Sequence, residues 1–64
     1  MCESKVFLKE GGKEELVMED VIRIEVLKEK IRLYDIFGES KEVKGKIVLV
    51  DMSSHRVVIE GGEM

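Results

Sequence analysis

One soft metal ligand stands out in this sequence, the thiol of Cys2, which is the single cysteine among the 64 residues. A cysteine thiolate suits nickel, copper(I) or zinc. If Met1 is retained, its amine, the Cys2 amide nitrogen and the Cys2 sulfur can form two fused five-membered chelate rings. If Met1 is removed, the Cys2 amine and sulfur can form one such ring. These near-planar donors favour Ni(II) or Cu(II), whereas zinc prefers a tetrahedron. The alternative is an incidental thiol near a chain end.

A metal site built on Cys2 needs more ligands than one chain offers. The single histidine, His55, lies near a turn signal, where a histidine is more often a surface residue than a ligand. Met18 and Met52 suit core packing better than metal ligation. A twofold dimer would bring two Cys2 residues together and complete the site. From the residues alone, the alternatives are a homodimer that binds Ni(II) or Cu(II) through Cys2 and a thiol that binds no metal.

Groups for catalysis are nearly absent from the sequence. A dyad of Cys2 and His55 would lack an identifiable third residue to orient it. The acidic residues of segment 14–20 lie in a strongly polar stretch and are expected to be solvated. Neither Gly-Gly pair is followed by the Lys-Ser/Thr sequence of a phosphate-binding loop. The sequence predicts a binding protein rather than an enzyme.

Apolar and polar residues alternate through most of the chain, a pattern typical of half-buried strands. The first residues of segment 13–24 would also suit a helix, but their alternating neighbours favour a strand at Glu15–Met18. Short turn signals separate the strands, so we predict an all-β fold: a small SH3-like or OB-like barrel of about six short antiparallel strands. This single domain spans residues 1–60, and a disordered tail is expected at 61–64. The predicted apolar faces are Val6 with Leu8; Ile22, Ile24 and Val26; Ile31 with Leu33; Val43, Gly45, Ile47 and Leu49; and Val57 with Ile59.

Two predicted hairpins gather basic residues on one exposed surface. A symmetric turn near Gly38 would place Arg32 opposite Lys46 and Tyr34 opposite Lys44. A symmetric turn near Lys28–Glu29 would place Glu25 opposite Arg32 and Arg23 opposite Tyr34. This surface is either a solvated face with an ion pair, or a nucleic-acid-binding face on which bases stack against Tyr34. Its members are Arg23, Arg32, Tyr34, Lys44 and Lys46, partly neutralised by Glu25.

Size and charge narrow the class of protein. A chain of 64 residues forms one small domain that buries only about 60% of its unfolded surface, so a metal or a partner chain would add needed stability. The net charge of −3 argues against strong non-specific binding to nucleic acid, which requires clustered Lys and Arg. No apolar run has the length of a membrane span, and the chain start does not match a signal peptide. We expect a cytoplasmic protein that does not associate with a membrane.

Four stretches resemble the CooT family in their order and spacing: MCES, GGKEELVMEDV, YDIFGESKEVKGKI and VDMSSHRVVIE. The resemblance runs from Met1 to about Glu60. It implies a compact β-barrel that forms a homodimer and takes part in nickel delivery to carbon monoxide dehydrogenase. It also implies that Cys2 binds Ni(II) near the dimer twofold. The family has in addition carried the label of predicted RNA-binding protein, which is similar to what the surface around Tyr34 suggests. The start of the chain and the barrel pattern also resemble the HypC hydrogenase maturation chaperones, whose second-position cysteine handles iron.

Overall fold

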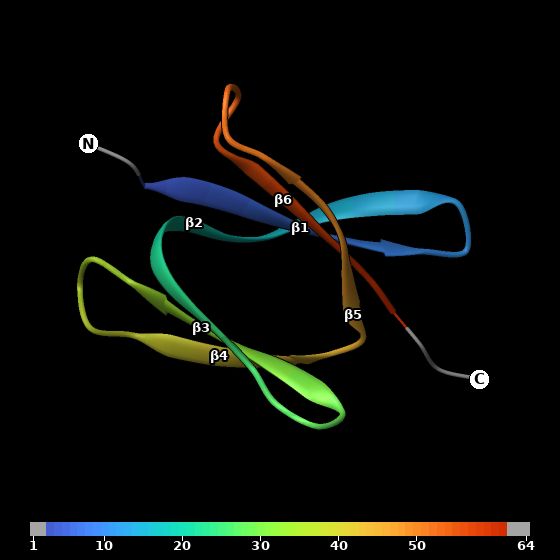
Figure 1. Ribbon diagram of the computed structural model, residues 1–64, viewed down its shortest axis with the longest axis horizontal. Coiled ribbons are helices and arrows are strands. Elements are labelled where there is room, and N and C mark those ends of the chain that lie inside the picture. The colour runs from blue at the N-terminus through green and yellow to red at the C-terminus, as the bar shows by residue number, and fades with distance from the viewer. Residues whose placement is uncertain (1–2, 62–64) are drawn as a thin grey trace.

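Six strands form a single sheet in the computed structural model, which describes residues 3–61 (Figure 1). These residues contain no helix, so the predicted all-β fold is confirmed. The predicted strand at Glu15–Met18 is part of the longest one, β2, which has 14 residues. The strands are β1 (Ser4–Glu10), β2 (Lys13–Val26), β3 (Lys30–Asp35), β4 (Ser40–Lys44), β5 (Lys46–Asp51) and β6 (Arg56–Glu60).

The strand order β4-β3-β2-β1-β6-β5 differs in two respects from a closed antiparallel barrel. Strands β4 and β5 are the two edges of the sheet, and in the described residues no ladder joins them. Strands β1 and β6 pair in parallel, whereas the other four pairs are antiparallel. Tight turns impose antiparallel pairing only on consecutive strands. The last strand, β6, runs beside β1 in the same direction. The turns between consecutive strands do not determine this pairing.

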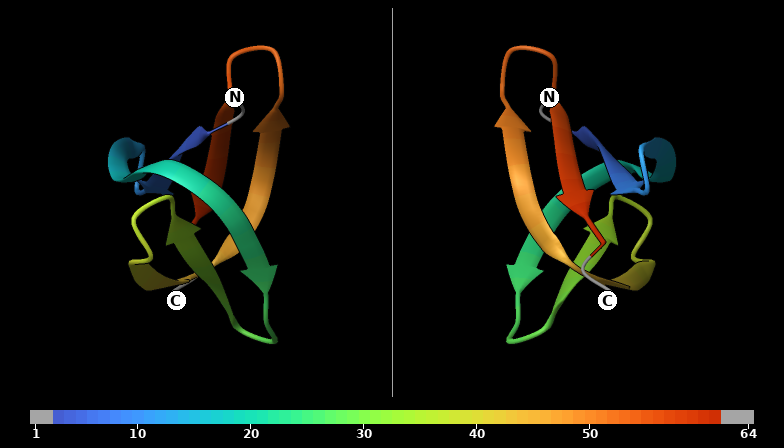
Figure 2. Two further views of the ribbon diagram at one scale, coloured as in Figure 1. Left: turned by 90° about the vertical axis from the view of Figure 1, so that its left-hand side faces the viewer. Right: turned by 90° about the vertical axis from the view of Figure 1, so that its right-hand side faces the viewer.

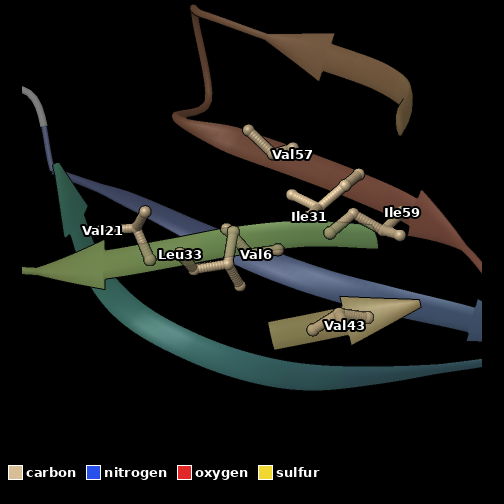
Figure 3. Packing of buried hydrophobic residues seen from close by; sticks show 7 residues of the cluster. All are labelled: Val6, Val21, Ile31, Leu33, Val43, Val57 and Ile59. Atoms are coloured by element: carbon tan, nitrogen blue, oxygen red, sulfur yellow. The ribbon is translucent and has the colours of Figure 1, made fainter. Parts of the chain in front are cut away.

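The sheet curls around one hydrophobic core (Figures 2 and 3). Strand β2 bends strongly as it passes from the side of β1 to the side of β3 (Figure 2). Leu8 and Ile47 pack against the core from neighbouring strands. The alternation predicted for β1, β3, β4 and β6 is therefore confirmed. The buried cluster consists of Val6, Val21, Ile31, Leu33, Val43, Val57 and Ile59.

A β-bulge in β2 overturns part of the predicted apolar face. Val21 pairs with Asp35 and Arg23 pairs with Tyr34, so Ile22 is an extra residue without a partner of its own. The bulge turns Val21 into the core and leaves Ile22 60% exposed. The prediction that Ile22 lies inside together with Ile24 is therefore wrong, because a period of two does not survive an inserted residue.

A second irregularity, in β5, gives the sheet a smaller apolar cluster on its outer face. A register shift between Ile47 and Leu49 places Leu49 opposite Val58, away from the core that Ile47 faces. Val58 also pairs with Phe7, which in turn pairs with Leu16. Val58 is buried within this row although its strand neighbours Val57 and Ile59 face the main core. Strand β6 is thus covered on both faces, and the predicted inward position of Leu49 is wrong.

Gly45 is the one residue between the edge strands β4 and β5, and we expect Gly45→Ala to destabilise the fold. Gly45 has a φ of +146°, and a Cβ there would lie 2.3 Å from the backbone oxygen of Glu60. The strained backbone alone costs about 1–3 kcal/mol, and the clash adds to it because backbone atoms must move. Urea unfolding should show a loss of at least about 2 kcal/mol.

Gly12→Ala is the matched control for this effect. Gly12 also has a positive φ, +85°, but a Cβ there would meet nothing within 4 Å among the described residues. Its cost should stay near that of the backbone strain. An equal loss of stability in both variants would show that the close approach to Glu60 is not what requires glycine at position 45.

Candidate functional site

The predicted metal ligand Cys2 lies outside the described residues, and the first strand after it is β1. Strand β1 begins at Ser4, which pairs with Val21 of β2. The next residue, Lys5, pairs with Arg56 at the start of β6. The start of β1 therefore lies between the bend of β2 on one side and the β5–β6 turn on the other.

The β5–β6 turn brings His55 next to the start of β1. The amide of Lys5 donates a hydrogen bond of 2.9 Å to the carbonyl oxygen of His55. The Asp51 carboxylate orders this turn by accepting hydrogen bonds from the Ser53 hydroxyl at 2.7 Å and from the amides of Ser53 and Ser54. These donors, led by Ser53, lower the pKa of Asp51. The sequence alone does not reveal that His55 lies next to β1. That contact depends on the pairing of β1 with β6, two strands that are far apart in the sequence.

The β3–β4 turn lies on the other side of the β1 start. Its first residue, Asp35, is buried, and one carboxylate oxygen accepts hydrogen bonds of 2.9 Å from the amides of Phe37 and Glu39. The amide of Ile36 donates to the carbonyl oxygen of Asp20 at 3.0 Å, which ties the turn to the bend of β2. Ile36 and Phe37 are both exposed at this turn. Sequence analysis did not single out either residue.

The face around Tyr34 is assembled as predicted from the β2–β3 hairpin. Arg23 pairs with Tyr34 and Glu25 pairs with Arg32, which confirms that register. The Arg23 guanidinium lies 5.5 Å from the centre of the Tyr34 ring. The Tyr34 hydroxyl donates to Glu25 at 3.1 Å. Both the ring and the hydroxyl of Tyr34 thus have partners within the protein.

The predicted pairings of Lys44 and Lys46 on this face are wrong. Tyr34 lies opposite Ser40, not opposite Lys44. The expected pairing centres the loop on Glu39, whereas the observed pairing centres it on Phe37, where the Asp35 carboxylate accepts two amide hydrogen bonds, so the register differs by four residues along β4. Arg32 therefore lies opposite Glu42. Lys44 lies opposite Lys30, and Lys46 lies opposite Glu60.

Glu42 changes the electrostatics of the face. Its carboxylate accepts two hydrogen bonds from Arg32, at 2.7 and 2.9 Å, and one from Lys30 at 3.0 Å. The Arg32 guanidinium, followed by the Lys30 ammonium, lowers the pKa of Glu42 below its usual range. Arg23 forms a further ion pair with Glu25 at 3.0 Å. Since both arginines of the face are paired with carboxylates, the nucleic-acid interface stays a prediction that the charge balance does not favour.

Lys44 belongs instead to a separate surface feature. Together with Leu27 it lines an open pocket of about 430 Å³ at the β2–β3 turn, along with Lys28, Glu29 and Lys30.

Residues 3–61 hold no cluster of three His, Cys, Asp or Glu side chains that could bind a metal ion. Over the same residues, no helix has the length and apolar character needed to cross a membrane.

Comparison with known proteins gives consistent results over nearly the whole chain. Residues 1–60 match the family model of the CO dehydrogenase accessory protein CooT. A protein of Methanothermobacter thermautotrophicus is 50% identical over 60 residues, which cover 94% of this chain and 89% of the relative. One from Archaeoglobus fulgidus is 46% identical over 44 residues, covering 69% of this chain and 98% of the relative. The crystal structure of a protein assigned as CooT from Carboxydothermus hydrogenoformans superposes with a TM-score of 0.87 at 35% identity, covering 97% and 100% of the two chains.

Proposed function

The chain belongs to the CooT family of carbon monoxide dehydrogenase accessory proteins, and on that premise we propose that it binds Ni(II) through Cys2 at a homodimer interface. The role would be that of a metallochaperone or a nickel store, and not of a catalyst. The observation that carries the proposal is the family match, because it includes residue 2 and extends to residue 60. The client would be a nickel enzyme such as carbon monoxide dehydrogenase.

The chemistry of the Cys2 donors supports nickel as the cargo. A thiolate with adjoining amine or amide nitrogens offers the planar nitrogen and sulfur set that suits Ni(II). The sequence holds one cysteine and one histidine, so a single chain has few soft donors to complete a site. A second copy would supply the second thiolate. The proposed stoichiometry is therefore one nickel ion for two chains.

Nickel titration monitored by absorption tests this proposal. A sulfur-to-nickel charge-transfer band should grow and saturate at about half an equivalent of nickel per chain, as a site shared by a twofold dimer requires. The affinity should fall as the pH is lowered, since the thiol must lose its proton to become a ligand. Saturation at one equivalent would contradict the shared site, and absence of the band would contradict ligation through sulfur.

A further inference from the structure

Three lysines line the pocket at the β2–β3 turn, although the chain as a whole is acidic. Lys28 belongs to the turn, Lys30 begins β3 and Lys44 ends β4. The net charge of the whole chain is −3. The positive charge at this pocket is therefore a local feature, and a concave surface lined by one sign of charge concentrates ions of the other sign.

Strand pairing holds two of these lysine side chains next to each other. Lys30 and Lys44 lie directly opposite in the antiparallel pair of β3 and β4, so their side chains leave the sheet on the same face. Like charges in this arrangement repel each other and destabilise a sheet. An anion bound between the two side chains would offset this repulsion, because it would attract both ammonium groups.

The carboxylates of the protein neutralise the lysines of the pocket only in part. Glu42 accepts a hydrogen bond of 3.0 Å from Lys30, but the same carboxylate also accepts two hydrogen bonds from Arg32. In the described part of the chain, no ion pair involves Lys28 or Lys44. Positive charge therefore remains at the pocket for a ligand to balance.

We propose that this pocket binds a small organic phosphate, namely a phosphate monoester with a compact, partly apolar organic group. Lysine binds phosphate well because its ammonium group is a compact charge with three hydrogen-bond donors. Three lysines and one glutamate, Glu29, leave the lining with two positive charges in excess, which a doubly charged phosphate balances. Leu27 supplies an apolar wall for the organic group. The volume of about 430 Å³ falls within the range of about 300–1,000 Å³ for small-molecule sites.

The pocket is separate from the proposed nickel site. Figure 1 shows the β2–β3 turn and the start of β1 on opposite sides of the molecule. The inference therefore goes beyond the proposed function and does not rest on it. Cys2→Ser should leave phosphate binding unchanged, so failure of the nickel proposal and failure of this inference are distinguishable.

Titration with phenyl phosphate at constant ionic strength, followed by two-dimensional NMR of the isotope-labelled chain, tests the inference. The amide signals of residues 27–30 and of Lys44 should shift and reach saturation with a single dissociation constant. Inorganic phosphate should shift the same signals but bind more weakly, because it has no organic group to contact Leu27. Spectra of every variant also show whether the sheet is folded, so loss of binding is distinguished from loss of structure.

Charge-neutralising variants locate the phosphate. Lys44→Gln should raise the dissociation constant for phenyl phosphate at least about threefold, within the range that one partly exposed ion contact contributes. Lys46→Gln is the matched control, because it removes the same charge two residues away, opposite Glu60 and outside the lining of the pocket. It should leave the dissociation constant unchanged. Glu29→Gln should lower the dissociation constant, since it removes the negative charge that repels the phosphate.

Three results would overturn the inference. The first is the absence of saturable shifts at the pocket, and the second is equal weakening of binding by Lys44→Gln and Lys46→Gln. The third is a single-stranded RNA oligomer that binds more tightly than phenyl phosphate and is weakened as much by Arg23→Gln as by Lys44→Gln, because the surface would then be a nucleic-acid interface. Equal affinity for inorganic phosphate and phenyl phosphate would contradict the organic ligand.

Discussion

Cys2→Ser is expected to remove the proposed tight nickel binding while leaving the fold and the proposed dimer intact. The affinity should fall at least about 100-fold, since removing even an outer partner of a metal ligand costs 10–100-fold. A serine hydroxyl keeps the size of the side chain but is a harder donor that does not form a thiolate-like bond with Ni(II). Isothermal titration calorimetry gives the affinity, and the charge-transfer band should be missing when the variant is titrated with nickel and followed by absorption.

Ser4→Ala is the control for the loss of nickel binding. Ser4 lies two positions from Cys2, at the first residue of β1, and its substitution removes a hydroxyl without removing a soft donor. Its nickel affinity should equal that of wild type. An unchanged affinity in the Cys2→Ser protein would show that nickel binds elsewhere, and the proposed function would then lose its site.

Leu33→Ala is expected to destabilise the fold strongly. Leu33 is 0% exposed, belongs to the core cluster and lies in the central part of β3. Truncating a buried leucine costs about 2–5 kcal/mol, from lost burial and from the cavity left behind. A domain of this size has a total stability of only about 3–10 kcal/mol. We therefore expect a protein that is partly or largely unfolded at 37 °C.

Leu16→Ala makes the same chemical change on the outer face and serves as its control. Leu16 is 46% exposed, so its substitution should cost less than about 1 kcal/mol. Both variants should be measured by urea unfolding at one fixed protein concentration, because the proposed dimer would make the apparent stability depend on concentration. Equal shifts of the midpoint would mean that the core is not where the structure places it.

The sequence correctly predicted which residues of a strand face the core only where apolar and polar residues alternate without interruption. In β3, the alternation of Ile31 and Leu33 with Arg32 was enough to predict both faces correctly. In β2 and β5 the same reasoning failed at Ile22 and Leu49, because each lies at a bulge where the period of two is interrupted. Bulges have no strong local signal in this sequence.

The two hairpins of the Tyr34 face show what sets a register. The β2–β3 pairing of Arg23 with Tyr34 was predicted correctly because the turn at Lys28–Glu29 is nearly symmetric. The β3–β4 pairing was not, because the Asp35 side chain closes its turn by binding the amides of Phe37 and Glu39. An aspartate three positions before Gly38 is a turn signal that could have indicated the shorter loop.

The sequence by itself determined the chemistry and the local structure of this protein. One thiol at Cys2, the all-β pattern and most core positions can be read from residue types and a period of two. Only the tertiary structure decided that β6 returns in parallel beside β1, and that the β5–β6 turn with His55 therefore lies next to the start of β1. The physical reason is that alternation and turns act between neighbours in sequence. Pairing between distant strands depends instead on how the whole sheet curls around its core.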